Sequence, residues 1–161
     1  MVFSKSFGYA IRGVLYIAIM QGEKRFVQAE EISQELTVPR HFMSKILKSL
    51  VKDRIIASVK GPMGGFTVSE NTFHTPLMTI FKKTEGLETF KTCVLCLTEC
   101  NSEHPCPLHT SIEDIRRRLN FVLVNTTIGD LLKEDKADFI KSISTQLHFN
   151  PELEQSYTAE N

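Results

Sequence analysis

The chain opens with a helical pattern of apolar residues. From Phe7 to Met20, apolar side chains recur at positions 7, 11, 14, 15 and 18, which is the 3.6-residue period of a helix with one buried face. Gly22 follows, and a glycine just past the last periodic residue is typical of a helix end. The pattern predicts a first helix that is closed by a turn at Gly22.

Two more helices are predicted close together, over 28–36 and about 39–53. The first carries acidic residues in its first turn, where they suit the positive helix end, and Pro39 suits the first position of the second. That second helix has an apolar stripe of Phe42, Met43, Ile46, Leu47 and Leu50, opposite a polar face of His41, Ser44, Lys45, Lys48 and Lys52. Two helices with so tight a link describe a helix-turn-helix.

A β-hairpin is predicted directly after these helices. Short β-branched or aromatic runs at 55–60 and 66–68 flank the sequence GPMGG. Its glycines, at positions 61, 64 and 65, allow backbone angles that other residues avoid, so the segment can close as a hairpin. A helix-turn-helix followed by a hairpin with a basic edge is a winged helix.

The second half of the chain predicts a long helix after a cysteine-rich loop. A short helix over 75–84 precedes the loop, and a last amphipathic helix over 135–148 follows the long one. Thr110-x-x-Glu113 has the form of a capping box at the start of the long helix. A narrow apolar seam follows at spacings of 3, 4 and 3, formed by Ile112, Ile115, Leu119 and Val122. Such a seam suits pairing with a second copy of the chain.

The expected fold class is therefore mainly α with a small β wing: a winged helix-turn-helix plus a long dimerisation helix. We expect four segments: a DNA-binding domain over 1–85, a cysteine loop over 86–109, the dimerisation helix and its following turn over 110–132, and a C-terminal helix and tail over 133–161. No apolar run approaches the roughly 18 residues of a membrane span, and no secretory signal is evident. We expect a cytoplasmic protein with no membrane partner.

The formal net charge of zero hides a basic segment. Residues 37–60 hold one acidic residue, Asp53, against six basic ones: Arg40, Lys45, Lys48, Lys52, Arg54 and Lys60. A local excess of positive charge in a neutral protein points to an anionic partner at one face. A solvated helix face is the alternative interpretation.

All four cysteines lie within fourteen residues, at positions 93, 96, 100 and 106. Crowded thiolates favour a bound metal, and without a secretory signal disulfides are the least favoured interpretation. The uneven spacing favours an iron–sulfur cluster over structural zinc, which usually takes two CxxC knuckles. Reactive thiols are a further alternative. No arrangement of nucleophile and base, phosphate-binding loop or carboxylate pair stands out, so no enzyme is predicted.

Together these motifs resemble the Rrf2 family of bacterial transcription regulators over about residues 1–132. The resemblance rests on the N-terminal motif Gly8-Tyr9-Ala10, the wing sequence KGPMGGF, the Cys106-x-x-His109 end of the cysteine loop, and the sequence TIGDL after the long helix. The cysteines make the chain similar to the iron–sulfur members of the family, the cluster-assembly regulator and the nitric-oxide sensor.

The resemblance implies a homodimer that binds a two-fold-related site on double-stranded DNA. The third helix would enter the major groove and the wing would lie along the adjacent minor groove. The predicted DNA-binding residues are Arg40, His41, Ser44, Lys45, Lys48, Lys60 and Gly61. Ser44 stands where the cluster-assembly regulator has a base-reading glutamate, so that regulator's preferred DNA sequence does not carry over.

The resemblance also implies the cluster ligands. They are Cys93, Cys100 and Cys106, with Cys96 or His109 as the fourth, around a 2Fe–2S or 4Fe–4S cluster that controls operator affinity. Two alternatives keep the same fold: a regulator with a structural zinc site or thiol-based redox sensing, and an interaction adaptor that does not bind DNA.

Overall fold

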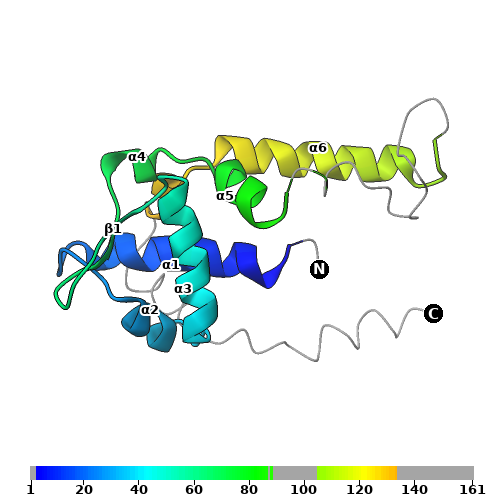
Figure 1. Cartoon of the computed structure of the whole chain (residues 1–161). Helices are drawn as coiled ribbons and strands as arrows, with labels where there is room; N and C mark the ends of the chain where they lie inside the picture. The colour runs from blue at the N-terminus through cyan, green and yellow to red at the C-terminus, as the bar shows by residue number, and fades with distance from the viewer. Residues whose placement is uncertain (1–2, 87, 89–104, 134–161) are drawn as a thin grey trace, which may run out of the picture.

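The structure is a computed structural model that describes residues 3–86, 88 and 105–133 (Figure 1). The described elements are α1 (Lys5–Met20), α2 (Ala29–Glu35), α3 (Arg40–Lys52), β1 (Ala57–Val59), β2 (Gly65–Thr67), α4 (Glu70–Phe73), α5 (Leu77–Thr84), α6 (His109–Asn125) and α7 (Ile128–Leu131). A mainly helical chain with one two-stranded antiparallel sheet confirms the predicted fold class. The helix predicted over 135–148 lies outside the described residues.

The segment before α5 differs from the prediction. A single helix was expected over 75–84, but a short α4 comes first and α5 begins only at Leu77, directly after Pro76. Proline lacks the N–H of a continuing helix and pushes the preceding residue out of helical geometry. Ser69 and Thr72 form the capping box that starts α4. The first strand is also shorter than the predicted run, because Ile55 and Ile56 are buried in the core after α3, and the second is shifted by one residue.

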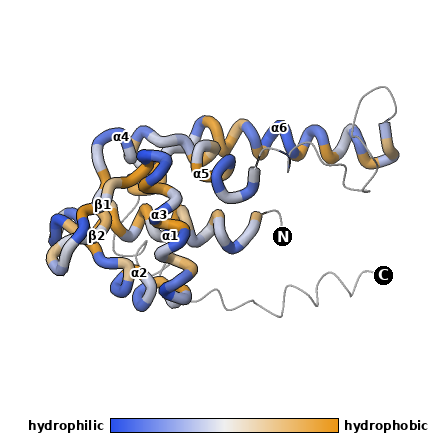
Figure 2. Tube along the Cα trace, in the orientation of Figure 1, coloured by the Kyte–Doolittle hydropathy of each residue, from blue (hydrophilic) through white to orange (hydrophobic). Residues whose placement is uncertain are grey.

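The core lies where α1 is packed by α3 and α5 (Figure 2). Gly13 lets α1 and α3 approach closely, since a Cβ there would lie 3.3 Å from the sulfur of Met43. On the other side of α1, the rings of Phe7 and Phe81 meet edge to face at 5.5 Å. Four of the five predicted stripe residues of α3 are buried, but Phe42 is 36% exposed and contacts Tyr9 at the rim instead.

The link between α2 and α3 is a Schellman turn. The N–H of Val38 donates to the carbonyl of Ser33 at 3.0 Å, and that of Thr37 to Gln34 at 3.2 Å. Thr37 takes the left-handed position with φ of 52°, which glycine usually fills. The same pattern closes α3, with Arg54 at φ of 59°. The first turn connects α2 to α3 and the second leads from α3 toward the wing, both without a glycine.

The wing is attached to the rest of the protein through the backbone of Val27, in the segment before α2. β1 and β2 pair with Ser58 opposite Phe66, and Phe66 also forms an antiparallel bridge with Val27. That bridge has two hydrogen bonds, of 2.9 and 2.8 Å. Gly65 permits the contact, because a Cβ there would lie 2.6 Å from the carbonyl oxygen of Val27. The hairpin is therefore held against the segment before α2.

Helix α5 packs against α6, and backbone hydrogen bonds join the start of α5 to the end of α6. The N–H of Leu77 donates to Thr126 at 2.9 Å, and that of Ile128 to Thr75 at 3.0 Å. The far end of α6 extends beyond the body (Figure 1). The predicted capping box at the start of α6 is wrong: the helix begins at His109 with no side-chain cap, so Thr110 lies inside it.

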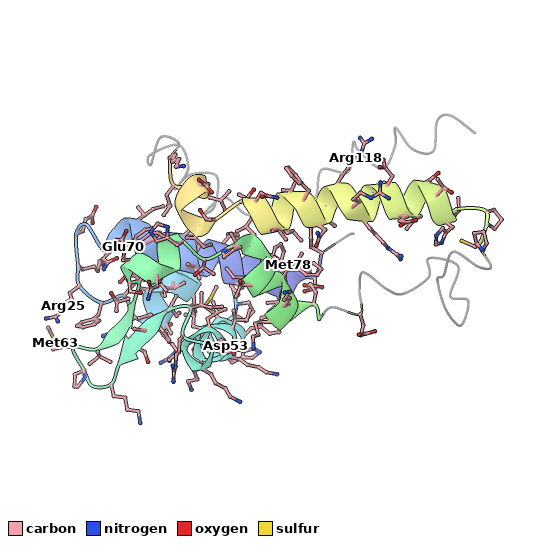
Figure 3. The ribbon with its side chains drawn as sticks, turned by 90° about the horizontal axis from the view of Figure 1, so that it is seen from above. Arg25, Asp53, Met63, Glu70, Met78 and Arg118 are labelled. Atoms are coloured by element: carbon pink, nitrogen blue, oxygen red, sulfur yellow. The ribbon has the colours of Figure 1, made fainter. Side chains whose placement is uncertain are left out.

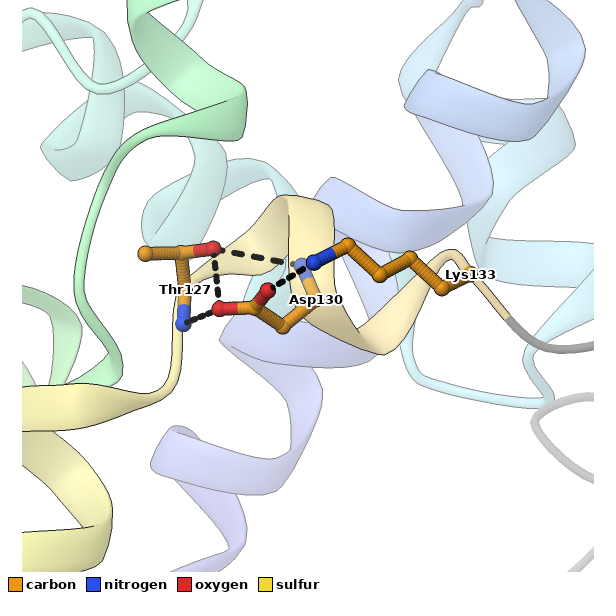
Figure 4. A network of polar contacts seen from close by, with 3 residues as sticks. All are labelled: Thr127, Asp130 and Lys133. Carbon is orange, nitrogen blue, oxygen red and sulfur yellow. Dashed lines mark hydrogen bonds and ion pairs between the residues drawn. The ribbon is translucent and has the colours of Figure 1, made fainter.

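A capping box does occur at α7 (Figure 4). The Thr127 hydroxyl accepts a hydrogen bond from the N–H of Asp130 at 3.2 Å, and the carboxylate of Asp130 accepts one from the N–H of Thr127 at 2.9 Å. Lys133 donates to the other carboxylate oxygen at 2.6 Å. The hydrogen bonds from Lys133 and then Thr127 hold the pKa of Asp130 well below its usual range.

Candidate nucleic-acid interface

The outer face of α3 carries most of the predicted DNA-binding residues. Arg40, His41, Lys45 and Lys48 are exposed, and Ser44 is half-buried. All belong to one 13-residue helix whose opposite face is buried in the core. Because the helix is anchored by that buried face, these side chains point together toward solvent as one basic surface. Their contact with DNA stays a prediction.

Arg40 lies at the junction of the two helices of the motif. Its Nε is 2.7 Å from Oε2 of Glu30 on α2, and both side chains are solvent-exposed enough to make this a weak ion pair. The pair orients the first turn of α3 relative to α2.

Two polar side chains of α1 position the motif, and both escaped the sequence analysis. Arg12 donates to the carbonyl of Leu36 in the turn between α2 and α3, at 3.0 Å. Tyr16 donates to Glu31 on α2, at 3.0 Å. Burial lowers the pKa of Arg12 and, with the hydrogen bond to Glu31, raises that of Tyr16. Their signal in the sequence was a polar group within an otherwise apolar helix.

The wing presents the remaining two predicted residues, Lys60 and Gly61, both exposed. Gly61 has a φ of +116°, and its carbonyl accepts from the N–H of Gly64 at 3.0 Å, which makes the tip a tight turn. Gln28 donates to the carbonyl of Pro62 at 2.9 Å, so the turn is also tied to the start of α2. Met63 at the tip is 90% exposed (Figure 3). Lys60 thus stands on a hairpin that is braced at both ends.

Of the predicted metal ligands, Cys106 and His109 lie within the described residues. Cys106 is a half-buried free thiol. Its carbonyl accepts from the N–H of His109 at 2.9 Å, which places both residues in the turn where α6 begins. His109 Nε2 lies 3.3 Å from a carboxylate oxygen of Glu113, and only 14% of the imidazole is exposed. Cys93, Cys96 and Cys100 lie outside the described residues, and the described ones hold no group of three or more potential metal ligands.

Helix α6 exposes large apolar side chains along its length. Of the predicted seam, Ile115 is 56% and Val122 is 52% exposed, whereas Ile112 and Leu119 are half-buried. Leu123, which is not part of the seam, is the residue of α6 that is buried in the core. The large exposed apolar residues are Leu108 at the N-cap position and, on α6 itself, Ile115, Phe121, Val122 and Val124. These apolar side chains, which alternate with exposed charged residues such as Arg118, are left uncovered by the described part of the chain.

A helix-turn-helix with a basic outer face and a braced hairpin defines a winged-helix protein. Residues 3–134 match the family described as Rrf2, iron-dependent transcriptional regulator. The chain belongs to the Rrf2 family, and it is an Rrf2-type transcriptional regulator rather than an enzyme. No described helix is long and apolar enough to cross a membrane.

Two curated relatives cover most of the chain. An HTH-type transcriptional regulator from Aquifex aeolicus is 29% identical over 82% of this chain and 92% of the relative. The HTH-type transcriptional regulator IscR from Photobacterium profundum is 25% identical over 92% of this chain and 86% of the relative.

Two solved structures have the same fold. CymR of Bacillus subtilis, described as its global cysteine regulator, superposes with a TM-score of 0.66 at 22% identity, covering 83% of this chain and 98% of CymR. IscR of T. potens gives 0.62 at 19% identity, covering 91% and 94%. At these identities the likeness concerns the fold.

Proposed function

We propose that this chain is a homodimeric, cytoplasmic DNA-binding regulator whose operator affinity is controlled by an iron–sulfur cluster. The observation that supports DNA binding is the basic outer face of α3, together with the exposed Lys60 of the wing. An exposed helix with this charge fits the major groove, while lysines supply phosphate contacts. The proposal assigns reading of bases to His41 and Ser44, and phosphate contacts to Arg40, Lys45 and Lys48.

Salt dependence of binding tests this assignment. A duplex recovered by selection from random sequence would be titrated with the protein at several salt concentrations, with fluorescence anisotropy as the readout. Lys48→Ala is expected to weaken binding and lower the log–log salt slope by about one unit, because one phosphate contact is lost. Arg118→Ala on α6 is the matched control and should leave the slope unchanged. A salt-insensitive complex would favour the adaptor alternative.

The dimer is proposed to form through the exposed face of α6. Leu108, Ile115 and Val122 are seven residues apart, so they recur on one side of the helix. A second copy that packs there would remove these side chains from water. Ile115→Asp is expected to yield a monomer in analytical ultracentrifugation, since it places a charge in that interface. Asn120→Asp, on the opposite side of α6, should remain a dimer; two monomeric or two dimeric variants would contradict the proposed face.

The described residues near the start of α6 fit the proposed cofactor. Cys106 offers a free thiol, and Glu113 contacts the imidazole of His109, which is the outer-sphere arrangement common for histidine ligands. Cys106 with Cys93, Cys100 and either Cys96 or His109 would hold the cluster, which would supply a redox-sensitive and exchangeable centre. Cys106 and His109 lie where α6 begins, so a cluster held there would stabilise the first turn of the dimer helix.

Cofactor content tests this part separately. Protein purified without air should be coloured and contain iron and acid-labile sulfide, and Cys100→Ser should lose both. Cys96→Ser and His109→Ala, compared in parallel, identify the fourth ligand by which of them loses the cluster. A colourless protein with stoichiometric zinc would contradict the cluster.

Thiol-based sensing is the second candidate, and one observation favours it. Cys106 is a free thiol that is reachable by solvent, and Staphylococcus aureus CymR, a structural neighbour with a TM-score of 0.64, has been solved in an oxidized form. DNA binding that responds to peroxide in protein that never contained metal would support this candidate over the cluster.

A further inference from the structure

A hollow of about 180 Å³ lies on one flank of α3, between that helix, the start of α1 and the end of α5. Its polar lining consists of Ser6 from α1, Lys45 and Ser49 from α3, and Lys83 and Thr84 from α5. The Thr84 hydroxyl already donates to the carbonyl of Ile80 at 3.1 Å, which leaves the two serine hydroxyls and the two lysines. Phe42 and Ile46 contribute apolar surface to it. Two lysines and two hydroxyl groups from three separate elements thus converge on one concave surface.

The hollow lies beside the predicted DNA-reading face and away from the wing. Lys45 belongs to both surfaces, since it lines the hollow and stands on the outer face of α3. In Figure 1, the wing lies on one side of α3, whereas α5 and the N-terminal half of α1 lie on the other. The hollow and the wing therefore flank the recognition helix from opposite sides.

The dimensions of the DNA major groove indicate what would contact the flank of α3 that carries the hollow. The major groove is about 12 Å wide, and a helix with its side chains is about 10–12 Å across. A helix in the groove therefore has a phosphate backbone against each flank. On one flank the wing supplies Lys60; on the other, the hollow supplies ammonium and hydroxyl donors, the groups that proteins use for phosphate oxygens.

We infer that this hollow binds a phosphate of the DNA backbone and that Lys83 on α5 is a phosphate ligand from outside the helix-turn-helix. The inference rests on the proposed DNA-binding function and adds a contact that the predicted residue set lacks. Within the described residues, the side chains of Ser6, Lys45 and Ser49 have no hydrogen-bond or ion-pair partner, so their donors are available. Lys83 is 47% exposed, so its ammonium group is accessible to a phosphate at the mouth of the hollow.

Lys83 also has a structural partner, which the experiment must separate from a role in binding. Its Nζ lies 2.7 Å from Oδ1 of Asp53, the residue that caps the C-terminus of α3 (Figure 3). The negative end of the helix dipole disfavours a carboxylate there, and Lys83 offsets that effect. A purely structural lysine would act through Asp53, so removal of either partner would have the same consequence.

Four variants of the full chain separate these roles, with the selected duplex and salt titration described above. Lys83→Ala should weaken binding several-fold and lower the salt slope by about one unit, whereas Lys83→Arg should retain the slope. Lys82→Ala changes the net charge equally in the same helix turn but does not line the hollow, so it should stay close to the wild type. Asp53→Asn breaks the ion pair but keeps Lys83, and it should bind DNA as tightly as the wild type or more tightly, because a negative charge near the phosphate is removed.

The outcomes are distinct. If Lys83→Ala behaves like Lys82→Ala, or if Asp53→Asn weakens binding as much as Lys83→Ala, the phosphate site is refuted while DNA binding by α3 stands. If the wild-type chain shows no salt-dependent DNA binding, the proposed function itself is refuted. Circular dichroism of each variant confirms that the compared proteins are folded.

Discussion

Replacement of Gly65 by alanine tests how the wing is held to the body. A Cβ at this position would lie 2.6 Å from the carbonyl oxygen and 2.8 Å from the carbonyl carbon of Val27. Both are backbone atoms, so no side chain can rotate away to make room. The residue also has a φ of +154°, which side-chain-bearing residues rarely adopt. Gly61→Ala is the matched control, since Gly61 also has a positive φ but has nothing within 4 Å of its Cβ position.

The two substitutions should lower the free energy of unfolding by different amounts, and the difference is the contribution of the bridge between Val27 and Phe66. Positive φ costs about 1–2 kcal/mol at either site. The clash at Gly65 additionally breaks the two bridge hydrogen bonds, each of which contributes about 1 kcal/mol. We therefore expect Gly61→Ala to lower the free energy of unfolding by about 1–2 kcal/mol and Gly65→Ala by about 3–4 kcal/mol. The second value is a large part of the roughly 5–15 kcal/mol of a typical domain.

Urea denaturation measures the free energy of unfolding, and hydrogen exchange shows where the loss occurs. In Gly65→Ala, the amides of Val27 and Phe66 should lose protection, while those in the middle of α1 and α3 keep it. DNA affinity should fall with the loss of a fixed wing. Equal stabilities of the two variants, with both bridge amides still protected, would refute the idea that the clash with Val27 decides the position of the wing.

Three further substitutions test single contacts. Thr37→Gly should stabilise the protein by about 1 kcal/mol in urea denaturation, because glycine adopts the left-handed turn between α2 and α3 without strain; a loss of stability would contradict the strain. Thr72→Val should lower the free energy of unfolding by about 1–3 kcal/mol. The buried Thr72 hydroxyl donates to the carbonyl of Ile55 at 2.7 Å, and that carbonyl oxygen would lose its partner. An unchanged midpoint of urea denaturation would show that the oxygen finds another donor. Asp130→Asn should reduce stability at neutral pH and lose its effect in acid. The folded-state pKa of Asp130 lies below its ordinary value of 3.8, so its contribution is present above that pH and disappears as the pH falls further. A difference from the wild type that persists undiminished in acid would contradict this origin.

The periodic elements of this chain were predictable because helix formation is local. Alternation of buried and exposed positions located α1, α2 and α3 to within two residues at each end, and the glycines of the wing located the hairpin. Errors arose where a local signal competed with another. Pro76 moved the start of the expected helix from Thr75 to Leu77. Thr110 has the sequence of a helix cap, but the helix begins at His109 and its N-cap position is Leu108. Phe42 fits the apolar stripe by spacing, but it lies at its rim.

The candidate site also has a part that was predictable from local spacing and a part that was not. The outer face of α3 follows from spacing alone, because residues one turn apart share a side of a helix. Arg12 and Tyr16 could not be assigned, since their partners on α2 and in the following turn become neighbours only through packing. The cysteine spacing indicated a metal, yet of the cysteines the structure describes Cys106 alone.

The amino-acid sequence by itself determined the winged helix-turn-helix, its basic outer face and the family to which the chain belongs, because each depends on residues close together along the chain. Tertiary structure alone decided which flank of α3 has a polar hollow, since Ser6, Ser49 and Lys83 come from three helices. It also decided that the wing is braced against Val27 and that, within the described residues, large apolar side chains of α6 stay exposed. Contacts of this kind depend on how the helices pack, and packing sums many weak interactions that no single stretch of sequence encodes.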